Sequence, residues 1–171
     1  MKKADLHELL ASQLGPLCRP QSDYSSVPFS FELRRQDSVI CRAYAWTITR
    51  QLGGRPQDEY KMQVILPGHK PKTRVRLDFG GGQFPLLIGY SPDFACWAFW
   101  DATSYADFTY SRNLQIREHT LSSTFVETVA RQTRIVRQHG DRIVETILAC
   151  QPAHLATAIE ERILLAGGSA T

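Results

Sequence analysis

Residues 38–51, SVICRAYAWTITRQ, restrict the possible folds of this chain more than any other segment. They are rich in β-branched and aromatic side chains, which favours a long strand. Because side chains alternate between the two faces of a strand, two sets should point in opposite directions. One face is expected to carry Arg42, Tyr44, Trp46, Ile48 and Arg50, and the other Val39, Cys41, Ala43, Ala45, Thr47 and Thr49. The chain is therefore expected to fold around a β-sheet.

Further strand-like segments follow, separated by turns rich in glycine and proline. The segment DEYKMQVIL at 58–66 alternates polar and apolar residues, and we expect it to form a hairpin with 38–51. Its outer face would carry Glu59, Lys61 and Gln63. The other strand-like segments are 73–79, 86–90, 95–102 and 114–118. This pattern predicts a central, mostly antiparallel sheet of about five to seven strands, or an open β-barrel.

A helix is expected in residues 1–17, where four leucines recur at helical spacing before Gly15 and Pro16. The predicted architecture is a single α+β domain over residues 1–171. It comprises this N-terminal helix, a β core at 38–117 and a C-terminal helical and strand segment at 122–166. The side chains expected to be mostly buried are Leu6, Leu9, Val39, Ile40, Tyr60, Met62, Leu86, Leu87, Ile88, Trp97 and Phe99.

The C-terminal segment is expected to contain helices and one strand. Residues 122–138 fit a helix, which Ser122 or Ser123 would cap. The β-branched content of RIVETILAC, at 142–150, favours a strand. Pro152 suits the first turn of a final helix.

The composition limits the classes of function without selecting one. A chain of 171 residues can bury a sizeable core, and a net charge of +3 permits a nucleic-acid partner without requiring one. The four cysteines form no CxxC pair, so we expect reduced, mostly buried thiols and no metal or other cofactor. No signal peptide or apolar span is evident, which predicts a cytoplasmic protein without a membrane partner.

Glu59 and Lys61 match the second half of a common Mg²⁺-dependent nuclease motif. In that motif, carboxylates hold the metal and the lysine orients the attacking water. Asp37 is the candidate for the further carboxylate, but it would lie at the far end of the expected hairpin, and Asp58 occupies the turn. We therefore assign no catalytic residue, and a nuclease is kept as an alternative.

Side chains suited to nucleic acid are concentrated in two segments. Arginine and lysine neutralise phosphates, while arginine and glutamine also bind base edges through paired hydrogen bonds. A solvated polar sheet face explains any one of these residues, but the group is unusually rich in amide and guanidinium groups. The candidate DNA-binding residues are Arg42, Trp46, Arg50, Arg55, Lys61 and Gln63 on the expected hairpin, and Arg112, Asn113 and Gln115 in YSRNLQIR.

Three motifs occur in the order CRAYAWTITRQLGGRPQDEYKMQV, PLLIGYSPDFACWAFWDA and YSRNLQIR. Together they resemble a bacterial family of DNA-binding domains associated with restriction-modification systems. Members of that family occur beside DNA methyltransferases or as N-terminal parts of restriction endonucleases. The resemblance covers about residues 38–117 and implies a small β-barrel-like fold with flanking helices.

This chain departs from the family pattern at two positions, with Lys61 in place of arginine and Thr47 in place of asparagine. Arginine cannot replace lysine in activating water, so an arginine at position 61 in relatives weakens the nuclease alternative.

The resemblance and the donor-rich segments together predict a DNA-binding specificity domain of a restriction-modification or defence system. Its expected partners are double-stranded DNA and a methyltransferase or endonuclease subunit, and no catalysis by this chain itself is expected. Two alternatives stay open: a Mg²⁺-dependent nuclease using Glu59 and Lys61, and a protein–protein adaptor of a defence complex.

Overall fold

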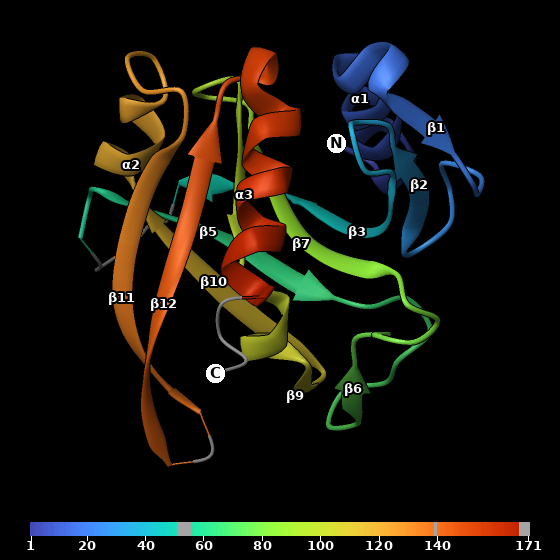
Figure 1. The fold of residues 1–171 in the computed structure, drawn as a ribbon. Coiled ribbons are helices and arrows are strands. Elements are labelled where there is room, and N and C mark those ends of the chain that lie inside the picture. Colours follow the sequence, from blue (N-terminus) through green and yellow to red (C-terminus); the bar gives the residue numbers. More distant parts are fainter. Residues whose placement is uncertain (51–55, 139, 168–171) are drawn as a thin grey trace.

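The computed structural model describes residues 1–50, 56–138 and 140–167 (Figure 1). Its largest sheet has seven strands in the order β1-β2-β3-β7-β8-β12-β11. Neighbouring strands are antiparallel except for β3 and β7, which run parallel. The strands are β1 (Cys18–Pro20), β2 (Phe29–Leu33), β3 (Val39–Thr47), β7 (Phe84–Ser91), β8 (Cys96–Trp100), β11 (Ala130–Gln138) and β12 (Asp141–Cys150).

Two smaller sheets lie beside the large one. The first has three antiparallel strands in the order β10-β5-β4, and the second pairs β6 with β9. These strands are β4 (Thr49–Arg50), β5 (Glu59–Ile65), β6 (Arg74–Arg76), β9 (Asp107–Thr109) and β10 (Ser111–Arg117). The three-stranded sheet crosses behind β11 and β12 in Figure 1.

Three α-helices complete the fold. The helices α1 (Lys3–Leu14) and α3 (Leu155–Gly167) cover one face of the seven-stranded sheet, and the short α2 (Glu118–Ser123) connects β10 toward β11 (Figure 1). Short 3-10 turns lie at Gly15–Leu17, Ala102–Tyr105 and Pro152–His154. The final helix therefore begins just after Pro152, as the sequence predicted.

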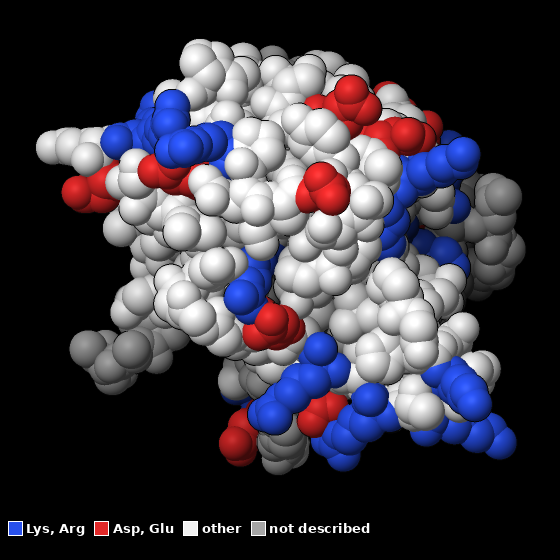
Figure 2. Space-filling view, turned by 90° about the vertical axis from the view of Figure 1, so that its right-hand side faces the viewer, with Lys and Arg blue, Asp and Glu red and all other residues white. Residues whose placement is uncertain are grey.

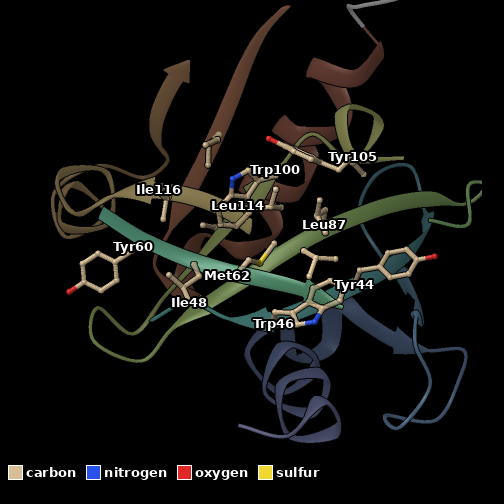
Figure 3. Close-up of a cluster of buried hydrophobic side chains, with 14 of the residues drawn as sticks. Tyr44, Trp46, Ile48, Tyr60, Met62, Leu87, Trp100, Tyr105, Leu114 and Ile116 are labelled. Carbon is tan, nitrogen blue, oxygen red and sulfur yellow. The ribbon is translucent and has the colours of Figure 1, made fainter. Parts of the chain in front are cut away.

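The seven-stranded sheet has a hydrophobic core on each face. The alternation in β3 explains this arrangement, because Tyr44 and Trp46 point into one core whereas Ala43 and Ala45 point into the other. The first core fills the space between the large sheet and the three-stranded sheet (Figure 3). The second lies beneath α1 and α3. Burial on both faces accounts for the apolar character of the central strands.

The chain passes from the large sheet to the small one at Ile48. Its backbone N–H donates to the carbonyl of Tyr90 at 2.7 Å, and its side chain lies over Gly89 of β7. A Cβ atom at position 89 would lie 2.6 Å from Cγ1 of Ile48, so only glycine leaves room for this crossing. The crossing allows β4 to pair with β5.

The expected hairpin between 38–51 and 58–66 is therefore wrong for most of its length. The long strand β3 pairs with β2 and β7, so both of its edges are occupied. Only Thr49 and Arg50 pair with β5. The residues before the crossing at Ile48 consequently belong to a different sheet from Lys61 and Gln63.

The helix expected at 122–138 is also wrong. Ser122 and Ser123 end α2 instead of capping a new helix, and residues from Ala130 onward form β11. The apolar spacing there fits a helix locally, but pairing with β12 provides a complete antiparallel ladder. Tertiary pairing thus overrides a short helical pattern.

The predicted α+β class, with a mostly antiparallel sheet and terminal helices, is confirmed. The strands do not close into a barrel, because no ladder joins β10 to β11 in the described part of the chain. Most of the predicted core is buried, but Ile40 is 41% exposed because it lies on an outer position of β3, and Leu9 and Val39 are only partly buried. Across the described ranges, no helix is long and apolar enough to cross a membrane.

Candidate nucleic-acid interface

One face of β5 supplies polar side chains. Tyr60, Met62 and Val64 are at most 3% exposed and pack in the core between the two sheets. Glu59, Lys61 and Gln63 alternate with them along the strand, so their side chains point away from that core. The sequence predicted this division of β5.

The strand β10 places a second set of polar side chains beside the first. Gln115 lies directly opposite Lys61, and Asn113 lies directly opposite Gln63. Cβ atoms of such opposing residues are about 5 Å apart. Thr49 of β4 lies opposite Lys61 on its other side. We call the surface formed by Thr49, Lys61, Gln63, Asn113 and Gln115 the polar face.

The polar groups of this face are available to a ligand. Within residues 1–50, 56–138 and 140–167, the side chains of Lys61, Gln63, Asn113 and Gln115 make no hydrogen bond or ion pair. At the end of the same ladder, Glu59 lies opposite Arg117. The polar face thus combines one ammonium group with three amide groups, which can both donate and accept hydrogen bonds.

Two other predicted residues lie at the borders of the polar face. Arg50 is bound within the protein, through the carbonyl of Gln57 at 3.2 Å and Glu118 at 3.4 Å. Arg112 occupies the opposite face of β10 from Asn113, and its guanidinium lies 5.7 Å from the centre of the Tyr105 ring. Arg112 and Asn113 are neighbours in sequence, but their side chains lie on different surfaces of the protein.

The structure separates Arg42 and Trp46 from the polar face. Arg42 forms an ion pair with Asp78 and donates to Gln83 at 2.6 Å. Trp46 is 8% exposed, and the Lys3 ammonium lies 3.6 Å from the centre of its ring. Both residues belong to β3, which the chain leaves before it reaches the three-stranded sheet. Arg55 lies outside the described residues.

A buried polar cluster joins the free edge of β10 to β11. Arg134 donates to Glu145 at 2.8 Å, to the Tyr105 hydroxyl at 2.7 Å and to the backbone carbonyl of Gln115 at 3.1 Å. Tyr105 also donates to Glu145 at 2.7 Å. Burial raises the pKa of the Tyr105 hydroxyl, and the neighbouring Glu145 carboxylate raises it further. Arg134 therefore holds β10 in place where the backbone ladder is missing.

The sequence did not reveal this cluster, because Arg134 fell within the expected helix at 122–138. Once β11 and β12 are recognised as a hairpin, Arg134 and Glu145 become directly opposed residues of opposite charge. A hollow of about 390 Å³ lies along the same junction, lined in part by Glu59, Gln115 and Gln132. The junction thus positions Gln115 of the polar face.

Glu59 and Lys61 share one face of β5, as the nuclease motif requires. The residues opposite them on β10 are Arg117 and Gln115, which cannot supply a second carboxylate. In the described ranges, no group of three His, Cys, Asp or Glu residues is arranged to hold a metal ion. The geometry therefore gives the polar face donors and acceptors of hydrogen bonds but no assembled carboxylate pair.

Together, these observations define a β-rich domain with an exposed, amide-rich sheet face. The family model for Methylase-associated X1 matches residues 40–159, so the chain belongs to the Methylase-associated X1 family. The match extends from β3 into α3 and includes the whole polar face. The association with methylases implied by the sequence motifs is thereby confirmed. No curated protein and no solved structure matches the chain.

Proposed function

We propose that this chain is the DNA-recognition component of a bacterial restriction-modification system, that it acts beside a DNA methyltransferase, and that it contacts duplex DNA through the polar face. The observation that carries the proposal is the direct opposition of two residue pairs, Lys61 with Gln115 and Gln63 with Asn113. Their side chains are free within the described residues. The family's association with methylases supports a role on DNA.

The four side chains suit two kinds of DNA contact. The Lys61 ammonium neutralises a backbone phosphate and fixes the position of the sheet on the duplex. The amides of Gln63 and Asn113 can each donate and accept along the edge of a base, with adenine as their preferred partner. Opposing side chains about 5 Å apart can reach neighbouring base pairs, which are stacked about 3.4 Å apart. The buried face of β5 holds these groups on a rigid support.

The test is DNA binding measured by fluorescence anisotropy at several salt concentrations. Lys61→Ala should weaken binding to all duplexes alike and reduce the slope of log K against log[salt] by about one. Gln63→Ala should instead cost about 1–3 kcal/mol on a preferred sequence and relax the preference at one position. Arg35→Ala is the matched control, because Arg35 pairs with Glu160 of α3 on the opposite side of the large sheet.

Unchanged binding in both Lys61→Ala and Gln63→Ala would refute the polar face as the DNA contact. A preferred sequence is obtained first, by selection from a random duplex library with the unmodified protein. The selection is repeated with methylated duplexes, which shows whether a modified base is read.

A second candidate function is docking to the methyltransferase itself, as an adaptor. Ile135 and Val144 lie directly opposite each other on the β11–β12 hairpin and are 58% and 71% exposed. Contiguous exposed apolar surface of this kind is a candidate for contact with another protein. In the adaptor case, Ile135→Glu abolishes co-purification with a methyltransferase from the same genome, and the unmodified chain alone does not bind DNA at low salt.

A further inference from the structure

Two arginines oppose each other near the tip of the β11–β12 hairpin. Arg137 and Arg142 are directly paired in the antiparallel ladder, and both are exposed. Like charges placed directly opposite one another destabilise a sheet. Three positions earlier in the same hairpin, on its opposite face, Arg134 pairs with Glu145, so the hairpin does accommodate opposite charges. The pair at the tip is therefore an unfavourable arrangement for the free protein.

Several other surface arginines of this protein have carboxylate partners. Arg35 pairs with Glu160, Arg74 with Asp107, and Arg131 with Glu161. By contrast, Arg112, Arg137 and Arg142 have no carboxylate within ion-pair distance in the part of the chain that the structure describes. The same holds for Arg76 and Arg117. The side chains of Arg112, Arg137 and Arg142 retain their full capacity to bind an anion.

A hollow of about 190 Å³ brings two of these arginines together. Arg112 and Arg137 both line it, and Tyr105 forms part of its wall. The Arg112 guanidinium lies over the Tyr105 ring, whose hydroxyl is fixed by Glu145. Asp107 also lines the hollow, but Arg74 binds both of its carboxylate oxygens, at 2.7 and 2.8 Å. The charge that remains in the hollow is positive.

The surroundings of the hollow are also basic. Figure 2 shows Lys and Arg side chains, with a few Asp and Glu among them, along the lower end of the molecule, where β6, β9 and the tip of the β11–β12 hairpin lie in Figure 1. The loop before β6 and β6 itself contribute the exposed basic residues Lys70, Lys72 and Arg76, beside Arg74, which pairs with Asp107. A positive surface of this kind attracts polyanions.

We propose that Arg112, Arg137 and Arg142 form a phosphate-binding site. The guanidinium group presents a planar set of donors that matches two oxygens of a phosphate. A bound phosphate would offset the repulsion between Arg137 and Arg142, so the like-charged pair favours anion binding. Because Arg112 lies on the opposite face of β10 from Asn113, this site is distinct from the polar face. The phosphate belongs either to a nucleic-acid backbone or to a free phosphate compound.

The experiment compares Arg112→Gln, Arg137→Gln and Arg142→Gln with the control Arg131→Gln, which removes the same charge from the same hairpin as Arg137. Three quantities are measured: the affinity for pyrophosphate by calorimetry, the salt dependence of binding to a random duplex, and the melting temperature without ligand. Arg137→Gln should weaken pyrophosphate binding by about tenfold. It should also raise the melting temperature, because it removes the repulsion from Arg142. Arg131→Gln should not raise the melting temperature, because it breaks the ion pair with Glu161.

The duplex measurement identifies the source of the phosphate. A salt slope reduced by about one in Arg137→Gln assigns the site to a nucleic-acid backbone. Loss of pyrophosphate binding with an unchanged duplex slope assigns it to a free phosphate compound. Unchanged binding of both ligands in Arg112→Gln and Arg137→Gln overturns the inference. The result for Lys61→Ala is independent of these outcomes, so failure of this site and failure of the polar face are distinguishable.

Discussion

Arg134 of β11 donates a hydrogen bond of 2.8 Å to Glu145 of β12, and the Glu145 side chain is fully buried. The same arginine reaches the carbonyl of Gln115, at the edge of the three-stranded sheet. One guanidinium therefore connects the paired strands β11 and β12 to β10, which no backbone ladder joins to β11 in the described part of the chain. The ion pair is part of the support for the polar face, and it can be tested by its effect on stability.

Arg134→Met should destabilise the protein by about 3–5 kcal/mol, because it leaves the Glu145 carboxylate buried without its partner. The double variant Arg134→Met, Glu145→Leu should recover much of that loss, since both charges are then absent. Urea denaturation followed by circular dichroism measures the free energy of unfolding. Equal losses in the single and the double variant would contradict this account of the pair.

Gly89→Ala should destabilise the fold by about 1–3 kcal/mol, the usual cost of overpacking a core. The added Cβ would lie 2.6 Å from Cγ1 of Ile48, at the point where the chain changes sheets. Combining it with Ile48→Ala should make the two effects non-additive, because the second change removes the clashing atoms. Gly167→Ala is the control, because a Cβ there has no atom within 4 Å. An equal cost at both glycines would argue against the crossing as the cause.

The buried thiols should resist alkylation in the folded protein. Burial raises the pKa of Cys41 and of Cys96 to about 12, so little thiolate is present near pH 8. Each folded-state pKa lies above the unfolded value, so the stability from these thiols is complete below about pH 9 and declines as the pH rises toward 12. Mass spectrometry after iodoacetamide treatment, with and without urea, checks this. Rapid labelling of either residue without urea would show that it is accessible in the native state.

The nuclease alternative predicts metal-dependent DNA cleavage that requires Glu59, whereas our proposal predicts no cleavage. We expect the purified chain not to cut plasmid DNA with Mg²⁺ or Mn²⁺, because the residues opposite Glu59 and Lys61 are Arg117 and Gln115. Gel electrophoresis after incubation with each metal measures cleavage. Cleavage that is lost in Glu59→Gln, with DNA binding intact, would establish the nuclease function and displace our proposal.

The sequence by itself determined the local character of most strands and both faces of β5. Period-two alternation is a property of the strand backbone, so Tyr60, Met62 and Val64 could be assigned to the core without knowledge of their neighbours. The same argument placed Lys61 and Gln63 outward. The strand predicted at 114–118 overlaps β10, which pairs with β5.

Only the tertiary structure decided which strands are neighbours. The alternation in β3 is compatible with a hairpin partner, yet the crossing at Ile48 over Gly89 sends the chain into another sheet and leaves Arg42 and Trp46 behind. Likewise, the apolar spacing at 122–138 permits a helix, and the long-range ladder with β12 makes it a strand. Pairing between distant segments depends on contacts that no local pattern encodes, which is why the Arg134–Glu145 pair and the arginines near the hairpin tip became visible only in three dimensions.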